Sequence, residues 1–166
     1  MALSRRWLIA LLPPVFLVLV LILAYMHDPH FYLDPETLYL RAKEAEKQGQ
    51  LDQALIMAQK SWKRSPENSD CGQFLGWLYL KQGKPEPALE ILQPLWNRDP
   101  TATSALKGVA QALHLMGRRP EALELLRNFL KDNPDEAEVL LFAAQLSGQR
   151  EEERTQAIEY YQQHYR

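Results

Sequence analysis

Apolar residues follow two different patterns, which divide the chain near residue 26. Residues 7–25, WLIALLPPVFLVLVLILAY, contain no charged side chain, whereas the rest of the chain mixes apolar and polar positions. A helix of this length is about 28 Å long, close to the hydrocarbon thickness of a bilayer. We therefore expect residues 7–25 to form an uncleaved transmembrane helix, with a kink at Pro13 and Pro14.

A cleaved secretory signal peptide is the alternative interpretation of this apolar segment. Such signals end in small residues, but only Ala24 is small near the end of the run. Arg5 and Arg6 precede the segment, and no Lys or Arg follows it until Arg41. The positive-inside rule places the N-terminus in the cytoplasm and residues 27–166 on the far side, which is the periplasm in a bacterium. A eukaryotic signal anchor is the other option.

Residues 27–166 carry a repeat with a period of 34 residues. Three sets of identical residues recur at this interval: Gly49, Gly83 and Gly117; Ala54, Ala88 and Ala122; Pro66, Pro100 and Pro134. Glycine closes a helix in a left-handed conformation at no steric cost, and proline blocks the continuation of a helix. Each period therefore predicts two helices. The glycine ends the first, the small alanine lies in the second where the two approach, and the proline follows.

This period and these residue types resemble the tetratricopeptide repeat, a helix-turn-helix unit. The resemblance implies an all-α fold: an N-terminal transmembrane helix, then a right-handed α-solenoid of three to four helix-turn-helix repeats, then a C-terminal capping helix. The expected divisions are a cytoplasmic lead and anchor (1–26), a juxtamembrane linker (27–34) and the array (35–166), with repeats at 35–68, 69–102 and 103–136 and an irregular cap at 137–166. Arg41 stands where this family usually has Leu, and Gly72 where it has a bulky residue. We expect both to loosen local packing.

Equivalent positions of successive repeats predict the core between repeats. Trp62 and Trp96 are 34 residues apart, and Leu130 takes the same place in the third repeat. Pro94 lies within the second helix of the second repeat and predicts a kink. In the cap, Ile158, Tyr161 and Tyr165 are expected to face inward.

No pattern of residues predicts catalysis. The chain has no phosphate-binding loop, nucleophile elbow or zinc-binding helix motif. His27 and His30 could share a metal, but the sequence places no third ligand, and the single cysteine, Cys71, is expected to be a small packed residue. The formal net charge of −2 gives no broad field to attract nucleic acid. We expect no enzyme activity, no cofactor, no metal and no nucleic-acid partner.

The resemblance also implies a binding groove lined by the first helix of each repeat. Carried over by register, the candidate partner-binding residues are Tyr39, Lys43, Gln73, Trp77, Lys107, Gln111 and His114. Large aromatic side chains can act as desolvated anchors, and amides can pair with the backbone of a bound peptide. The alternative for Trp77 is that it packs against its neighbours.

Cytosolic heat-shock co-chaperones with this repeat clamp a C-terminal carboxylate with Lys and Asn at two inner places of the first repeat, which here hold Tyr39 and Lys43. Among the matching places only Lys107 fits, so such a clamp is not expected. The sequence predicts a non-catalytic scaffold, anchored in the bacterial inner membrane, that binds protein or peptide partners in the periplasm and supports assembly of an envelope complex. A cytosol-facing receptor on an organelle membrane and a periplasmic chaperone are the alternatives.

Overall fold

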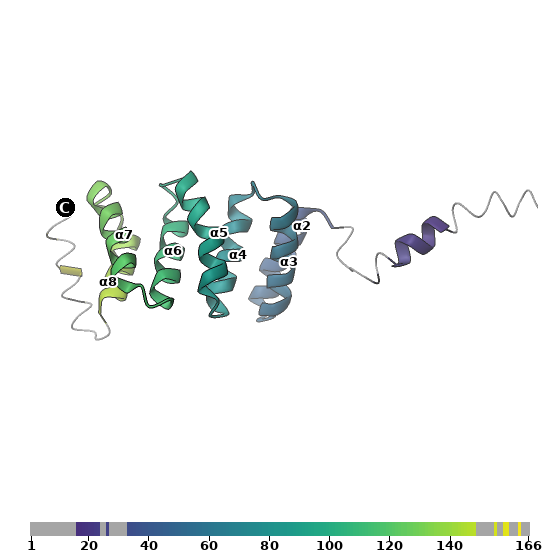
Figure 1. The fold of residues 1–166 in the computed structure, drawn as a ribbon, viewed down its shortest axis with the longest axis horizontal. Coiled ribbons are helices and arrows are strands. Elements are labelled where there is room, and N and C mark those ends of the chain that lie inside the picture. Colours follow the sequence, from purple (N-terminus) through teal and green to yellow (C-terminus); the bar gives the residue numbers. More distant parts are fainter. Residues whose placement is uncertain are drawn as a thin grey trace, which may run out of the picture.

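Helices stacked in a single row make up the part of the chain that follows residue 33 (Figure 1). A computed structural model describes residues 16–23, 26, 33–148, 155, 158, 159 and 163. The elements within 33–148 are α2 (Pro35–Lys47), α3 (Leu51–Arg64), α4 (Ser69–Lys81), α5 (Pro85–Arg98), α6 (Thr103–Leu115), α7 (Arg119–Asp132) and α8 (Ala137–Ser147), and none of the described residues lies in a strand. The fold of this part is thus all-α, as expected. The first helices α2, α4, α6 and α8 begin at intervals of 34 residues, the period of the glycine, alanine and proline ladders.

Local side-chain chemistry sets the helix ends. The carboxylate of Asp34 accepts the Thr37 backbone N–H at the start of α2 (2.9 Å), and the side chain of Asn68 accepts the backbone N–H of Cys71 in α4 (3.0 Å). Both satisfy N–H groups that have no partner within the helix. Each first helix is followed by a glycine with positive φ: 76° at Gly49, 68° at Gly83 and 78° at Gly117. The predicted role of these glycines in the turns is therefore confirmed.

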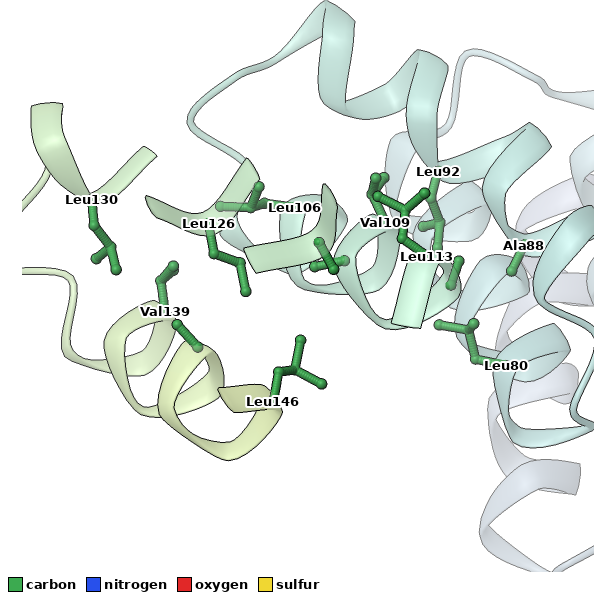
Figure 2. Packing of buried hydrophobic residues seen from close by; sticks show 14 of the residues in the cluster. Leu80, Ala88, Leu92, Leu106, Val109, Leu113, Leu126, Leu130, Val139 and Leu146 are labelled. Carbon is green, nitrogen blue, oxygen red and sulfur yellow. The ribbon is translucent and has the colours of Figure 1, made fainter. Parts of the chain in front are cut away.

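The hydrophobic core consists of two clusters that meet at α4. The first cluster joins α2, α3 and α4 and contains Ala42, Ala45, Ala54, Leu55, Ala58, Leu75 and Leu78. The second cluster extends from Leu80 to Leu146 and is built mainly from leucine and valine contributed by α5 to α8 (Figure 2). The side chain of Tyr79 packs against both clusters. The three residues of the alanine ladder, Ala54, Ala88 and Ala122, are all fully buried, as expected for small side chains packed between paired helices.

Two glycines bring α5 close to both of its first-helix neighbours. A Cβ atom at Gly76 of α4 would lie 2.4 Å from Leu92 Cγ, and one at Gly108 of α6 would lie 2.7 Å from Leu92 Cδ1. Leu92 is fully buried and inserts between these two backbones. The second and third repeats are therefore joined by one leucine that fills space left by two absent side chains.

The aromatic positions predicted for the core are confirmed. Trp62 packs against the first cluster and Trp96 against the second, while Leu130 is fully buried. Ile158 of the cap also packs against the second cluster, whereas Tyr161 and Tyr165 lie outside the described residues. At Pro94 the helix is not interrupted, because α5 continues to Arg98.

The expectation that Gly72 loosens local packing is wrong. A Cβ atom at this position would lie 2.7 Å from Trp62 Cζ3 and 2.8 Å from Leu95 Cδ1. The indole and the leucine therefore already fill the space in which the family places a bulky side chain. Arg41, the other departure, is exposed on α2.

The predicted anchor at 7–25 lies largely outside the described residues. Its described part, residues 16–23, is helical, and every side chain there is exposed. Over the described residues no helix has both the length and the apolar character needed to span a bilayer. His27 and His30 also lie outside the described residues.

Candidate functional site: the inner face of the helical array

The two layers of helices are spaced differently, and this difference defines an inner face. The first helix α4 packs directly against α6, and α6 against α8. Among the second helices, furrows separate α3 from α5 and α5 from α7. A row of paired helices bends toward the layer in which neighbours lie closer together. The face formed by α2, α4, α6 and α8 is therefore the concave, inner face of the array.

Side chains at equivalent positions of the first helices form columns along this inner face. One column contains Tyr39, Gln73, Lys107 and Leu141, the next contains Lys43, Trp77, Gln111 and Gln145, and a third contains Glu46, Leu80 and His114. The seven candidate residues from the sequence all lie in these columns. Lys43 is exposed and the other six candidates are partly buried. Leu80 belongs to the core and does not line the face.

An aromatic pair occupies the inner face at its α2 end. The rings of Tyr39 and Phe74 meet edge to face, with centroids 5.7 Å apart and an interplanar angle of 73°. The ammonium of Lys43 lies 5.2 Å from the centre of the Tyr39 ring, a cation–π contact. Phe74 was missed at the sequence level. Its place in the 34-residue period, one position after Gln73, is the signal that could have identified it.

Trp77 belongs both to the core and to the inner face. Its ring packs against the second core cluster, and its indole Nε1–H donates a hydrogen bond to Ser104 Oγ of α6 (3.4 Å). The side chain remains partly exposed. The sequence left open whether Trp77 is a groove anchor or a packing residue. In the structure one part of its side chain packs on the core and another part is exposed on the inner face.

Two lysines on or beside the inner face, Lys107 and Lys81, form ion pairs with acids of the neighbouring first helix. Lys107 Nζ of α6 lies 2.7 Å from Glu138 Oε2 of α8, and this hydrogen bond lowers the pKa of the Glu138 carboxyl. Lys81 of α4 pairs with Glu46 of α2. These ion pairs tie successive first helices together, and Lys43, which lies over the Tyr39 ring, is the remaining lysine of the columns.

The side-chain amides of the inner face, those of Gln73 and Gln111, are not paired in this way. Neither Gln73 nor Gln111 hydrogen-bonds to another side chain or backbone group within the described part of the chain. Nδ1 of His114 is a buried atom that also lacks a hydrogen-bond partner there. The inner face thus combines aromatic rings with unpaired neutral polar groups, a combination that suits an uncharged peptide backbone.

The described residues hold no arrangement typical of catalysis or metal binding. No group of three or more His, Cys, Asp or Glu side chains lies close enough to hold an ion within the described ranges. Cys71 is fully buried, its Sγ–H donates to Ser61 Oγ (3.2 Å), and burial raises the pKa of the thiol. A buried thiol with a raised pKa is a packing residue, as the sequence predicted.

Comparison with known families identifies the repeat. Residues 45–113 match one family model described as tetratricopeptide repeat, and residues 103–146 match a second model with the same description. Together the two matches cover more than half of the chain and include α4 to α8 almost completely. The chain therefore belongs to the tetratricopeptide-repeat proteins. No curated protein matches it significantly.

Solved structures with a similar fold include tetratricopeptide-repeat domains of several kinds. A structure of MamA AMB-1 has 22% sequence identity and a TM-score of 0.62, with 78% of each chain covered. The second TPR domain of human RPAP3, solved in complex with the HSP70 peptide SGPTIEEVD, has 17% identity and a TM-score of 0.59, covering 69% of this chain and 99% of that one. The Sgt2 TPR domain from Aspergillus fumigatus has 15% identity and a TM-score of 0.55, covering 78% and 77%. These likenesses establish the fold.

Proposed function

We propose that this chain is a non-catalytic scaffold that binds a segment of a partner protein along its inner face. The observation that carries the proposal is the pairing of partly exposed aromatic rings, Tyr39 and Trp77, with the unpaired amides of Gln73 and Gln111. A ring that packs on the core is a rigid surface for an apolar anchor, and an amide can hydrogen-bond to both the N–H and the C=O of an extended backbone. A segment lying across α2, α4 and α6 would meet both kinds of group.

The charges of the inner face favour an internal, uncharged segment over an acidic C-terminus. Lys107 and Lys81 are already paired with Glu138 and Glu46. An incoming carboxylate would have to displace these acids, which costs the existing ion pairs. We therefore expect no measurable binding of a peptide ending in EEVD, the kind of ligand present in the RPAP3 complex.

We further propose that residues 7–25 anchor the array in a bacterial inner membrane, with the N-terminus in the cytoplasm and the array in the periplasm. The uncharged run and the preceding Arg5 and Arg6 support this placement. An anchor confines the array to a thin layer and raises its effective concentration toward membrane-bound partners, which suits assembly of an envelope complex.

Topology is tested by protease access to a C-terminal tag. We expect the tag to be digested in spheroplasts but not in intact cells. Protection of the tag in spheroplasts, with digestion only after lysis, would favour the receptor with a cytosol-facing array.

Binding is tested by in-cell crosslinking of the tagged full-length chain, followed by affinity purification and mass spectrometry. We expect Trp77→Ala and the double variant Gln73→Ala/Gln111→Ala each to lose a specific set of partners. Glu86→Ala, which changes an exposed residue of α5 outside the inner face, is the matched control and should keep them. Circular dichroism of each variant separates lost binding from lost folding. A full partner set retained by the folded double variant would refute the inner-face site.

A further inference from the structure

The outer face carries an apolar furrow between α3 and α5 that the inner-face proposal does not use. A cavity of about 170 Å³ lies in it, lined by Trp62, Pro66, Ile91, Pro94 and Leu95. Small-molecule sites are larger, roughly 300–1,000 Å³, so this cavity has the size for a single side chain. It lies on the second-helix face, opposite the inner face.

The equivalent furrow between α5 and α7 indicates what fills such a space. Trp96, the equivalent of Trp62, packs edge to face on Phe129, with ring centroids 5.7 Å apart and planes at 65°. The residue of α5 that corresponds to Phe129 is Leu95. The furrow between α5 and α7 therefore contains a pair of aromatic rings beside a cavity of about 330 Å³, whereas in the furrow between α3 and α5 Leu95 takes the place of the second ring.

A glycine of α4 lies beneath the furrow between α3 and α5. Trp62 and Leu95 lie directly against the backbone of α4 at Gly72, where an added Cβ would clash with both. At the equivalent place in α6, the fully buried Leu106 occupies that space. Trp62 and Leu95 therefore pack on the backbone of α4 at this point, and both also line the cavity.

Pro94 leaves a backbone hydrogen-bond acceptor without its helical donor on a residue that lines this cavity. Proline has no N–H, so the carbonyl oxygen of Glu90, four residues earlier in α5, lacks its helical donor. Glu90 and Pro94 both line the cavity. A ring that also carries a donor can therefore pack on Trp62 and hydrogen-bond to this carbonyl. Tryptophan combines the largest ring with an obligatory N–H donor.

Two charges flank the cavity on α5. Glu90 lies one helical turn before Pro94 and Arg98 one turn after it, and both are exposed. Arg98 donates one N–H to Ser69 Oγ (2.6 Å), which holds its guanidinium in place. The spacing of eight positions from Glu90 to Arg98 corresponds to roughly 12 Å along the helix. An extended chain covers this distance in about four residues.

We propose that this furrow binds a tryptophan side chain of a protein partner, presented by an extended segment with a basic residue two positions before the tryptophan and an acidic residue two positions after it. Alternate residues of an extended segment point to the same side. The basic residue then faces Glu90, the indole enters the cavity on Trp62, and the acidic residue faces Arg98. The furrow and the inner face lie on opposite sides, so the two sites bind different segments.

The test uses the full-length chain in detergent micelles and the peptide acetyl-GKSWSDG-amide with 5-fluorotryptophan, followed by fluorine NMR. We expect saturable binding. Leu95→Phe places in this furrow the ring that Phe129 supplies in the next one, and should weaken binding by about tenfold or more. Arg127→Ala, which changes an exposed residue of α7 outside both sites, should leave the affinity unchanged. The readout is this peptide and not the set of cellular partners, so failure here is distinct from failure of the inner-face site.

Two further variants keep the test informative if Leu95→Phe disturbs folding. Pro94→Ala returns an N–H to the Glu90 carbonyl, and should weaken the tryptophan peptide but not the matched phenylalanine peptide. The double variant Glu90→Lys/Arg98→Glu changes only exposed charges, and should reverse the preference between acetyl-GKSWSDG-amide and acetyl-GDSWSKG-amide. Absence of saturable binding, or equal affinities of both peptides for both proteins, would overturn the proposal.

Discussion

Gly72, Gly76 and Gly108 lie within helices, where side chains of neighbouring helices touch their backbones. Leu92 uses the space at Gly76 and Gly108, while Trp62 uses the space at Gly72. The family pattern, which expects a bulky residue at position 72, correctly predicts that the space there is filled. It wrongly predicts that the side chain filling it belongs to α4. In this chain the side chain that fills the volume comes from the second helix of a pair.

Gly76→Ala is expected to destabilise the array by about 1–3 kcal/mol, because the new methyl would lie against Leu92 Cγ, a branch point that cannot rotate away. Urea denaturation of both proteins measures the change. A useful comparison is Gly83→Ala, where nothing lies within 4 Å but φ is +68°. The free energy of unfolding of that variant should fall by about 1–2 kcal/mol through backbone strain alone. If Gly76→Ala left the free energy of unfolding unchanged, α4 and α5 could move apart at this point without cost.

Cys71 is expected to resist alkylation in the folded protein. The side chain is fully buried and burial raises the pKa of its thiol, so at neutral pH neither access nor thiolate is available. The rate of reaction with iodoacetamide, measured with and without denaturant, checks this. Labelling of the native protein at the rate of the denatured one would contradict the packing of Cys71 against Ser61.

At the scale of the helices, the sequence predicted the turns well because glycine and proline act locally. Gly49, Gly83 and Gly117 require positive φ, and the proline ladder follows each second helix, so no distant contact is needed to locate these boundaries. The columns of the inner face follow from the same period. This is why Tyr39 and Trp77 could be assigned to one surface from the sequence.

Contacts between helices could not be predicted in the same way. The edge-to-face pair of Tyr39 with Phe74 and the ion pair of Lys107 with Glu138 depend on how side chains orient across neighbouring repeats. The period specifies which positions face each other, but it does not determine which rotamers meet. The shape of the furrow beside Trp62 also depends on which side chains of neighbouring helices pack there, which the period does not specify.

The start of α2 makes stability depend on pH. Hydrogen bonds from the Thr37 side chain and backbone lower the pKa of Asp34 below its usual 3.8. Because the folded pKa is the lower one, the stabilisation is present above 3.8 and is lost as the pH falls through the folded value. Asp34→Asn keeps a capping oxygen without the charge. We expect wild type to melt at a higher temperature than this variant at neutral pH, and the difference to vanish in strong acid. A difference that is constant across the acid range would show that the charge does not contribute.

At the scale of the whole array, the two core clusters should differ in stability. The first cluster is built largely from alanine, whereas the second cluster, which includes Leu92, Leu106 and Leu126, buries much larger side chains. Buried apolar area is the main stabilising term in folding. We therefore expect amides of α2 and α3 to exchange hydrogen faster than those of α5 and α6. Hydrogen-exchange mass spectrometry measures this, and uniform protection from α2 to α7 would mean that the clusters unfold as one unit.

The division of the core at α4 also has a consequence for the order in which the protein is made. Contacts between the described helices join elements that are adjacent, or next but one, in the chain. Loops that close over such short distances form quickly. The buried residues of the first cluster all come from α2 to α4, and only Ile91 of α5 packs at its edge, so most of the cluster can close while α5 to α8 are still being synthesised. Each later pair of helices then meets a surface that is already folded, and the nascent array grows from its N-terminal end.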